Sequence, residues 1–431
     1  MNSGKRPTGR IEIGKAEGDP RTLGRPLMSD HNLSARVWAT AALLAVPLAP
    51  AIGLGWWLPM HLALLGAATQ AIAGGQLMFS VTLGLSRGPR RSEVLYQLGL
   101  LNLGALLVVA GRWANEATVL ASGATIVVAA AVWVGWRVHR ISRDSPNRRF
   151  SITGTFYRLA AVSIVAGASI GGALGAGIFD DASSYLEHRS LHMTLNVFGW
   201  AGLTIVGTAI TLLPTILHVR APSLRGLRAT PWLMFGGLAV LSTGASLDTG
   251  WLAGAGMTAY VLGLGTFGMY ARQILVTQRR RKVPTAALHL MAALVWAAVT
   301  TLALIVTSSS SDHAAGRDLV VVGGGVGFVF QALLGAWSFI LPSTRPPVPE
   351  QRRRELVAME LGGRVQVIAY NLGAGIALIG LRTDMDVEMI GISLTWTAAA
   401  WALTKSWSFP LLARLPVVQR WSERWWAAPL L

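Results

Sequence analysis

The strongest constraint on the fold is a series of apolar runs of about 20 residues, separated by short polar loops. A transmembrane α-helix needs about 20 consecutive apolar residues, so each run is predicted to cross a bilayer. The composition agrees, since 13% of the residues are charged, whereas soluble proteins carry about 25%. We therefore predict an all-α integral membrane protein with about twelve transmembrane helices. The predicted spans are 37–58, 60–85, 94–111, 117–136, 152–179, 191–217, 231–247, 251–271, 286–307, 319–342, 365–381 and 390–409.

Two tails flank this predicted membrane domain, which occupies residues 37–409. Residues 1–36 are polar and rich in glycine, proline and charge, and are predicted to form a disordered cytoplasmic tail. Residues 410–431 mix tryptophans with arginines, as at Arg420-Trp421. That mixture predicts a segment at the cytoplasmic membrane interface.

The loops differ in charge according to which ends of the predicted helices they join. Loops after the second, fourth, sixth, eighth and tenth spans carry 21 Lys and Arg residues, and the alternate loops carry four together with ten acidic residues. Because basic loops stay on the cytoplasmic side, both termini are predicted to be cytoplasmic. The net charge of +17, including the basic run 279–282, is then assigned to anionic lipid head groups rather than to nucleic acid.

Two histidines at equivalent positions are the main candidates for a functional site. His61 and His192 each lie at the start of a long apolar run, in the spans 60–85 and 191–217. Both spans are predicted to enter from the outer side, so both imidazoles are expected near the outer surface. An ionisable group inside a membrane span is expensive and is a functional candidate by default.

The neighbours of these histidines suggest a metal. Met60 and Met193 are adjacent in sequence, and imidazole and thioether are suitable ligands for haem iron and for Cu(I). We predict a b-type haem or, as a second option, copper, held by His61 and His192 with Met60 or Met193 completing a copper site. Asn196, one turn after His192, is expected to orient an imidazole or to bridge helices. The open alternative is that both histidines simply bond to loops or to each other.

Three further polar positions lie outside this site or at its edge. His188, one turn before His192, is the loop histidine that could join it. His289 opens a span at the inner side and is predicted to be an ordinary interfacial residue. Tyr370 lies within the span 365–381 and is expected to line a cavity or to bridge helices.

The sequence contains an internal repeat. Gly207 and Pro214 in the sixth span match Gly335 and Pro342 in the tenth, at the same spacing and 128 residues apart. The two candidate histidines lie 131 residues apart, on the second and sixth spans. The second, sixth and tenth spans are therefore predicted to be equivalents in three pseudo-repeated units of four helices.

This layout resembles the catalytic subunit (subunit I) of haem–copper oxidases and nitric oxide reductases. In that family, histidines on the second and tenth helices hold a low-spin haem, and the sixth and seventh helices supply copper ligands beside a second haem. This sequence has no histidine in 231–247 or in 319–342, where Gln331 is the most prominent polar residue. The resemblance therefore implies an oxidase-like bundle without that family's oxygen-reducing centre.

A second, more specific resemblance concerns the membrane portion of bacterial multicopper-oxidase-like proteins, in which a similar bundle often precedes domains similar to copper nitrite reductase. It rests on the segments HLALLGAATQAI (61–72), RFSITGTFYRLAAV (149–162), HMTLNVFGWAGLTIVGTAITLLPTIL (192–217) and FVFQALLGAWSFILP (328–342). The sequence departs from that pattern at Gln76, where a second histidine late in the second span is expected. It also contains no cupredoxin domain, so a separate copper protein is the implied partner.

These observations lead to one preferred function and two alternatives. The preferred prediction is a multi-pass protein of the bacterial plasma membrane that binds haem or copper and passes electrons between the quinone pool and an extracytoplasmic cupredoxin-type protein. The alternatives are a copper or small-solute transporter and a non-catalytic scaffold for an enzyme partner. The chain has no cysteine, which excludes thiolate ligands, iron–sulfur clusters and c-type haem attachment. No enzyme activity is predicted for this chain alone.

Overall fold

The computed structural model describes residues 20–147, 150–179, 181–247, 249–278, 282–307, 313–345, 348–383 and 387–426. Within these ranges the chain forms helices and no strand. The elements are α1 (Pro20–Leu48), α2 (Trp57–His61), η1 (Leu62–Ala68), α3 (Thr69–Gly84), α4 (Arg91–Ala114), α5 (Ala117–Arg143), α6 (Phe150–Gly175), α7 (Ala182–Thr194), η2 (Leu195–Gly202), α8 (Leu203–Ile216), η3 (Arg225–Leu227), α9 (Thr230–Ser246), α10 (Gly250–Thr277), α11 (Thr285–Thr307), α12 (His313–Asp318), η4 (Leu319–Phe330), α13 (Gln331–Thr344), α14 (Pro349–Met359), α15 (Gly363–Thr383), α16 (Val387–Leu412) and α17 (Pro416–Trp426).

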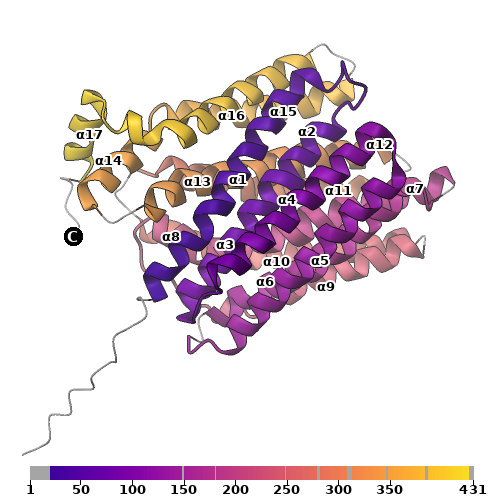
Figure 1. Cartoon of the computed structure of the whole chain (residues 1–431), viewed down its shortest axis with the longest axis horizontal. Helices are drawn as coiled ribbons and strands as arrows, with labels where there is room; N and C mark the ends of the chain where they lie inside the picture. Colours follow the sequence, from indigo (N-terminus) through magenta and orange to yellow (C-terminus); the bar gives the residue numbers. More distant parts are fainter. Residues whose placement is uncertain are drawn as a thin grey trace, which may run out of the picture.

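The long helices lie side by side in one bundle, with α7 and α12 at one end and α14 and α17 at the other (Figure 1). Nine helices in the described ranges are long and apolar enough to cross a membrane. They are Trp57–Gly84, Arg91–Ala114, Ala117–Arg143, Phe150–Gly175, Ala182–Ile216, Gly250–Thr277, Thr285–Thr307, Ala314–Thr344 and Pro349–Thr383. The prediction of an all-helical fold is confirmed for the described residues, and the nine candidate spans agree with a multi-pass membrane protein. The predicted first, seventh and twelfth spans correspond to α1, α9 and α16, which are not among the nine.

The first helix begins earlier than the sequence predicted. Residues 20–36, assigned to a disordered tail, belong to α1 because one side of this segment packs against α3. His31 is fully buried there, and its Nδ1 lies 2.8 Å from Oε1 of Gln70. Trp337 donates to the side chain of buried Asn32 over 3.2 Å. These polar side chains lower the hydropathy of the segment although they face the bundle interior, so hydropathy placed the start too late.

At the other end of the chain, α16 ends at Leu412 and α17 turns back to pack beside α14. Val418 of α17 is fully buried, while Trp421 is 45% exposed. Residues 1–19 of the predicted N-terminal tail, 279–281 of the basic run and 427–431 of the C-terminal tail lie outside the described residues.

Three antiparallel helix pairs pack closely through glycines: α4 with α5, α9 with α10, and α15 with α16. A Cβ added at Gly111, Gly256 or Gly391 would come closer than 3.0 Å to backbone atoms of the partner helix. Such contacts between small residues are the usual means by which membrane helices approach each other, since lipid tails provide no hydrophobic drive between helices.

Three helices at the centre contain π-helical segments. The continuous helices α2–η1–α3, α7–η2–α8 and α12–η4–α13 carry 7, 8 and 12 residues of π-helix. These helices touch one another: Trp200 donates to Thr69 over 3.3 Å and Gln76 donates to Thr204 over 2.8 Å. A π-turn is rare and frequently marks a functional site. The residues beside these central segments are therefore candidates for a functional site.

Candidate functional site

His61 and His192 lie next to each other although 131 positions separate them in sequence. Their ring centroids are 6.3 Å apart, and the ring planes differ by 11°. His61 is the residue before η1 and His192 lies three residues before η2. The ring pair therefore sits where two central helices change from α to π geometry.

Each imidazole is held by its Nδ1 atom. Nδ1 of His61 is 2.8 Å from the carbonyl oxygen of Trp57, and Nδ1 of His192 is 2.8 Å from that of Gly167. A carbonyl oxygen can only accept, so both Nδ1 atoms must carry the proton and donate. In a neutral imidazole the lone pair then lies on Nε2. This arrangement, with Nδ1–H on a backbone carbonyl and Nε2 as the donor atom, is the usual one for metal-binding histidines.

Packing fixes both rings. His61 stacks on Trp57 with centroids 3.9 Å apart and planes 21° apart. His192 lies directly over Gly171 of α6, where an added Cβ would come within 2.5 Å of ring atom Cε1. Because only glycine leaves room for the ring at this position, α6 determines where the imidazole of His192 can lie.

Asn196 lies on the anchored side of the His192 ring. Its Nδ2 donates to the carbonyl oxygen of His192 over 2.7 Å and lies 3.3 Å from Nδ1 of the same residue. It also packs against Gly167 of α6. The amide thus braces the turn that carries His192, and its contact is with Nδ1 rather than Nε2.

The two methionines have other neighbours. Met60 lines a cavity on the side of α2 that faces η4, and its Sδ would lie 3.7 Å from a Cβ added at Gly325. Met193 packs against the main apolar core. The thioether of Met60 is therefore directed toward the cavity, and the donor set that the structure brings together is two imidazoles.

Two nitrogens bound to one metal at about 2 Å lie about 4 Å apart. The two rings, with centroids 6.3 Å apart, are close enough for one metal to be held between them. In the described ranges no group of three His, Asp or Glu residues is placed to hold a metal ion. A centre at this pair would hence have only two protein ligands from this set, the number that bis-histidine haem requires.

His188 and His289 lie outside the pair. His188 stacks on Phe179 with centroids 3.8 Å apart, and its Nδ1 is 2.8 Å from the carbonyl oxygen of Ser184. His289, predicted to be interfacial, is fully buried instead. Its two ring nitrogens lie 3.0 Å from Nε2 of Gln366 and 3.5 Å from Nε2 of Gln331. His289 is buried together with these two glutamines, whereas the sequence predicted an ordinary interfacial residue at the inner side.

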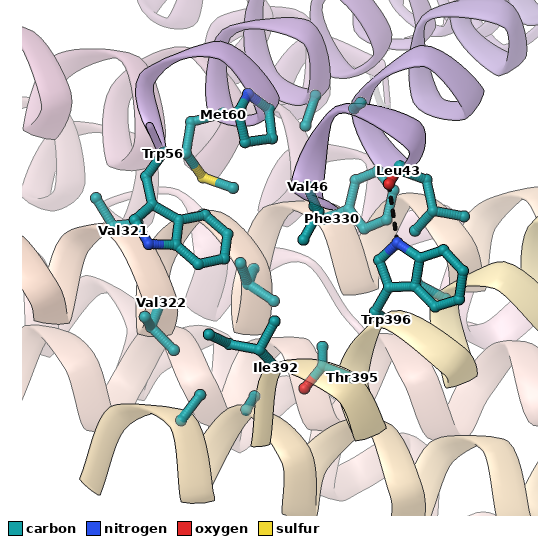
Figure 2. Close-up of a pocket in the computed structure, with 18 of the residues that line it drawn as sticks. Leu43, Val46, Trp56, Met60, Val321, Val322, Phe330, Ile392, Thr395 and Trp396 are labelled. Carbon is teal, nitrogen blue, oxygen red and sulfur yellow. Dashed lines mark hydrogen bonds between the residues drawn. The ribbon is translucent and has the colours of Figure 1, made fainter. Parts of the chain in front are cut away.

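A cavity of about 330 Å³ opens between α1, α2, η1, η4, α15 and α16. Its walls are mainly apolar, and Figure 2 shows Trp56 and Met60 on one side with Trp396 and Leu43 on the other. Arg317, Asp318 and Glu388 lie at the end of the bundle that carries α7 and α12. Tyr370, for which the sequence left cavity lining as an option, lines the cavity and donates to the carbonyl oxygen of Val326 over 3.0 Å.

Sequence reasoning missed most of this cavity. Its residues come from both ends of the chain, so no local pattern brings them together. The one available signal was Asp318, an acidic residue directly before the apolar span 319–342 and 6% exposed in the structure.

Comparison with known proteins provides no assignment. No protein family matches the chain, and no curated protein matches it at a significant level.

Proposed function

We propose that this protein binds a metal centre, b-type haem or copper, between His61 and His192. The centre would pass electrons between the membrane quinone pool and an extracytoplasmic cupredoxin-type copper protein. One observation carries the proposal: two imidazoles that are far apart in sequence lie next to each other with nearly parallel rings. Each donates Nδ1–H to a backbone carbonyl, which leaves the lone pair that could bind a metal on Nε2.

The proposal includes twelve membrane-spanning helices, with α1, α9 and α16 added to the nine candidates. The 17 residues of α9 extend about 26 Å at 1.5 Å per residue, close to the roughly 30 Å of a hydrocarbon core. Each of these three helices packs along a candidate span: α1 on α3, α9 on α10 and α16 on α15.

Three units of four helices are supported by a pattern that recurs along the chain. In each unit the second helix contains a π-helical segment, and the third and fourth helices form a glycine-packed pair. The three π-containing helices meet at the centre. This recurrence agrees with the spacing of the Gly and Pro residues in the sequence and with an oxidase-like bundle.

The location of the metal centre follows from the loop charges. The basic loops lie at the α14/α17 end, as for Arg353, and the acidic loops at the α7/α12 end, as for Asp181. With the basic loops in the cytoplasm of a bacterium, the ring pair lies near the outer face of the plasma membrane. That is the position from which an extracytoplasmic protein can exchange electrons with it.

The chemistry supplied by the chain is binding and positioning. A bound haem or copper would supply one-electron transfer. The two carbonyl anchors hold the proton of each neutral imidazole on Nδ1 and leave the lone pair on Nε2, and Trp57 and Gly171 limit ring rotation. Asn196 supports the backbone at His192. No proton-transfer or bond-breaking role is assigned to these residues.

The test is the absorption spectrum and metal content of the purified protein. We expect a haem Soret band, or stoichiometric copper without one, that His61→Ala and His192→Ala each reduce by at least tenfold. His188→Ala is the matched control, because it removes an imidazole one turn away on the same helix. Copper without haem would also favour the transporter alternative. Full metal and haem content in both alanine variants, or no metal in the folded wild type, would refute the metal site and leave the scaffold alternative.

A further inference from the structure

We infer that the cavity between α1, α2, η4, α15 and α16 binds an uncharged amphiphile with a planar polar head, of the isoprenoid quinone class. The inference rests on the proposed function only for the role of the bound molecule as redox partner. The shape, charge and aromatic lining of the cavity support the binding itself.

The cavity has the dimensions of an amphiphile. On α16 its lining extends from Glu388 to Ala399, which is about 16 Å at 1.5 Å per residue. The volume is about 330 Å³, within the usual range for small-molecule sites of about 300–1,000 Å³. Most of the lining side chains are aliphatic, as at Val322 and Ile392. A hydrocarbon tail fits such a space, and a small ion or sugar does not.

The charged groups of the lining lie toward the α7/α12 end of the cavity and can contact a head group there. Arg317 contacts Asp318 at 2.9 Å through Nε and at 2.8 Å through Nη2, and both contacts use Oδ1. A guanidinium has five N–H donors, and a carboxylate accepts through both oxygens. The pair therefore offers a hydrogen-bond donor for a quinone carbonyl and an acceptor for a quinol hydroxyl.

The charge at this end disfavours a phospholipid. One guanidinium, Arg317, lies among the lining residues with two carboxylates, Asp318 and Glu388. The formal charges of the three side chains sum to −1. Phosphate recognition normally uses arginine or lysine in excess. An uncharged head group avoids the repulsion that an anionic phosphate would meet here.

The aromatic lining favours a flat ring. Trp56 and Trp396 stand on opposite sides of the cavity in Figure 2. The indole N–H of Trp396 donates to the carbonyl oxygen of Leu43 over 2.8 Å, which fixes the orientation of the ring. Aromatic pairs prefer stacked or edge-to-face contact and add about 0.5–1.5 kcal/mol beyond area burial. A planar head at the α7/α12 end gains such contacts from Trp56, which directly precedes α2, whereas Trp396, further along α16 than Glu388, lies beside the tail.

The cavity and the ring pair lie on either side of one helical turn. Met60 lines the cavity, and the next residue, His61, contacts His192. A quinone bound in the cavity would therefore lie beside the helix that carries one of the two candidate metal ligands. This adjacency links the two sites without any side chain belonging to both.

A cavity-filling variant tests the inference. A Cβ at Gly325 would meet Leu64 and Met60 only at ordinary contact distances of 3.7 Å, so Gly325→Leu should fold and place its remaining carbons in the cavity. Gly316→Leu is the matched control, since nothing lies within 4 Å of a Cβ at that position. Binding of decylubiquinone to the full chain in detergent is measured by quenching of tryptophan fluorescence. We expect at least a tenfold weaker affinity for Gly325→Leu and an unchanged affinity for Gly316→Leu.

A second variant protects the test against misfolding. Ile392→Trp fills the same cavity from α16 and should weaken binding by a similar factor. Arg317→Gln, which shortens and neutralises the donor, should weaken it about tenfold. Unchanged affinity in both cavity-filling variants, or displacement of decylubiquinone by phosphatidylglycerol but not by menaquinone, would overturn the inference.

The two proposals fail separately. His61→Ala should lose metal and keep quinone affinity, and Gly325→Leu should lose quinone affinity and keep metal. Quinone binding in a protein without metal would leave the cavity assignment intact and refute the metal site. If the protein binds metal but cavity filling leaves its quinone affinity unchanged, the metal site stands and the cavity assignment is refuted.

Discussion

The position of the His192 ring depends on two glycines of α6. Gly167 supplies the carbonyl that receives Nδ1–H, and Gly171 leaves the space in which the ring lies. His61 obtains the same arrangement from its own helix, through the carbonyl of Trp57 one turn earlier. One imidazole is thus held locally and the other by a neighbouring helix, which makes His192 the more sensitive of the two to changes elsewhere.

Gly171→Ala should displace the imidazole of His192 without unfolding the protein. The added Cβ would lie 2.5 Å from Cε1, and overpacking of this kind costs about 1–3 kcal/mol. Replacing a helical glycine by alanine returns about 0.5–1 kcal/mol of stability. We expect metal affinity to fall about tenfold to a hundredfold, measured by competition with a chelator. Gly99→Ala, where nothing lies within 4 Å of the Cβ, should bind metal as the wild type does. Equal affinities would show that the ring position is not set by α6.

The sequence could predict which imidazoles meet but not how they are held. Equivalent positions on two parallel spans suffice to expect His61 and His192 at one depth. The carbonyl of Gly167 is invisible to a residue pattern because every residue has one. The sequence also could not predict the direction of the Met60 side chain. Adjacent residues on a helix point about 100° apart, and the pattern does not show whether Met60 or His61 faces α7.

The glycine-packed helix pairs account for much of the architecture. In α4–α5, α9–α10 and α15–α16 the backbones approach so closely that only glycine fits at the contact. In the order of the chain, each of these pairs follows one of the three π-containing helices. Dense packing by small residues gives each pair stability independent of any bound group.

Gly256→Leu should destabilise the protein through the α9–α10 pair. Its Cβ alone would come closer than 3.0 Å to backbone atoms of Leu241 and Gly237, so the helices must separate. A loss of at least about 1–3 kcal/mol is expected, seen as a lower midpoint of thermal unfolding in detergent. Gly265→Leu is the control on the same helix, because it is exposed and nothing lies within 4 Å of its Cβ. A surface change of that kind is expected to stay within about 0.5 kcal/mol. Similar midpoints for the two variants would argue against close packing at this pair.

Element positions followed the hydropathy pattern where a helix is apolar on all sides. The predicted span 286–307 corresponds to α11 at Thr285–Thr307, and 152–179 to α6 at Phe150–Gly175. The pattern gave too late a start for α1, whose buried side carries His31 and Asn32. It also gave no sign of the π-helical segments, because apolar periodicity over a continuous helix does not distinguish i→i+4 from i→i+5 hydrogen bonds. Glycines within each of these segments, such as Gly66 and Gly199, were the only local hint.

The two ends of the bundle differ in the charge of their loops. The end that carries α14 and α17 holds the loops with most of the arginines, and the α7/α12 end holds the acidic loops, the ring pair and the charged end of the cavity. Both candidate sites therefore face the same side of the membrane. Whether that side is the outer one decides which redox partners can reach the ring pair.

Reporter fusions should place the ring pair on the outer side. Twenty-one Lys and Arg residues in one set of loops against four in the other are a strong orientation signal, since positive loops resist translocation. Alkaline phosphatase, which is active only outside the cytoplasm, should be active when fused after Glu187 and inactive when fused after Arg353. A fluorescent protein that matures only in the cytoplasm should give the opposite result at both positions and serves as the control for expression. Activity of the phosphatase at Arg353 would invert the topology and place His61 and His192 on the cytoplasmic side. The ring pair would then be out of reach of an extracytoplasmic copper protein, even if both histidines bind metal.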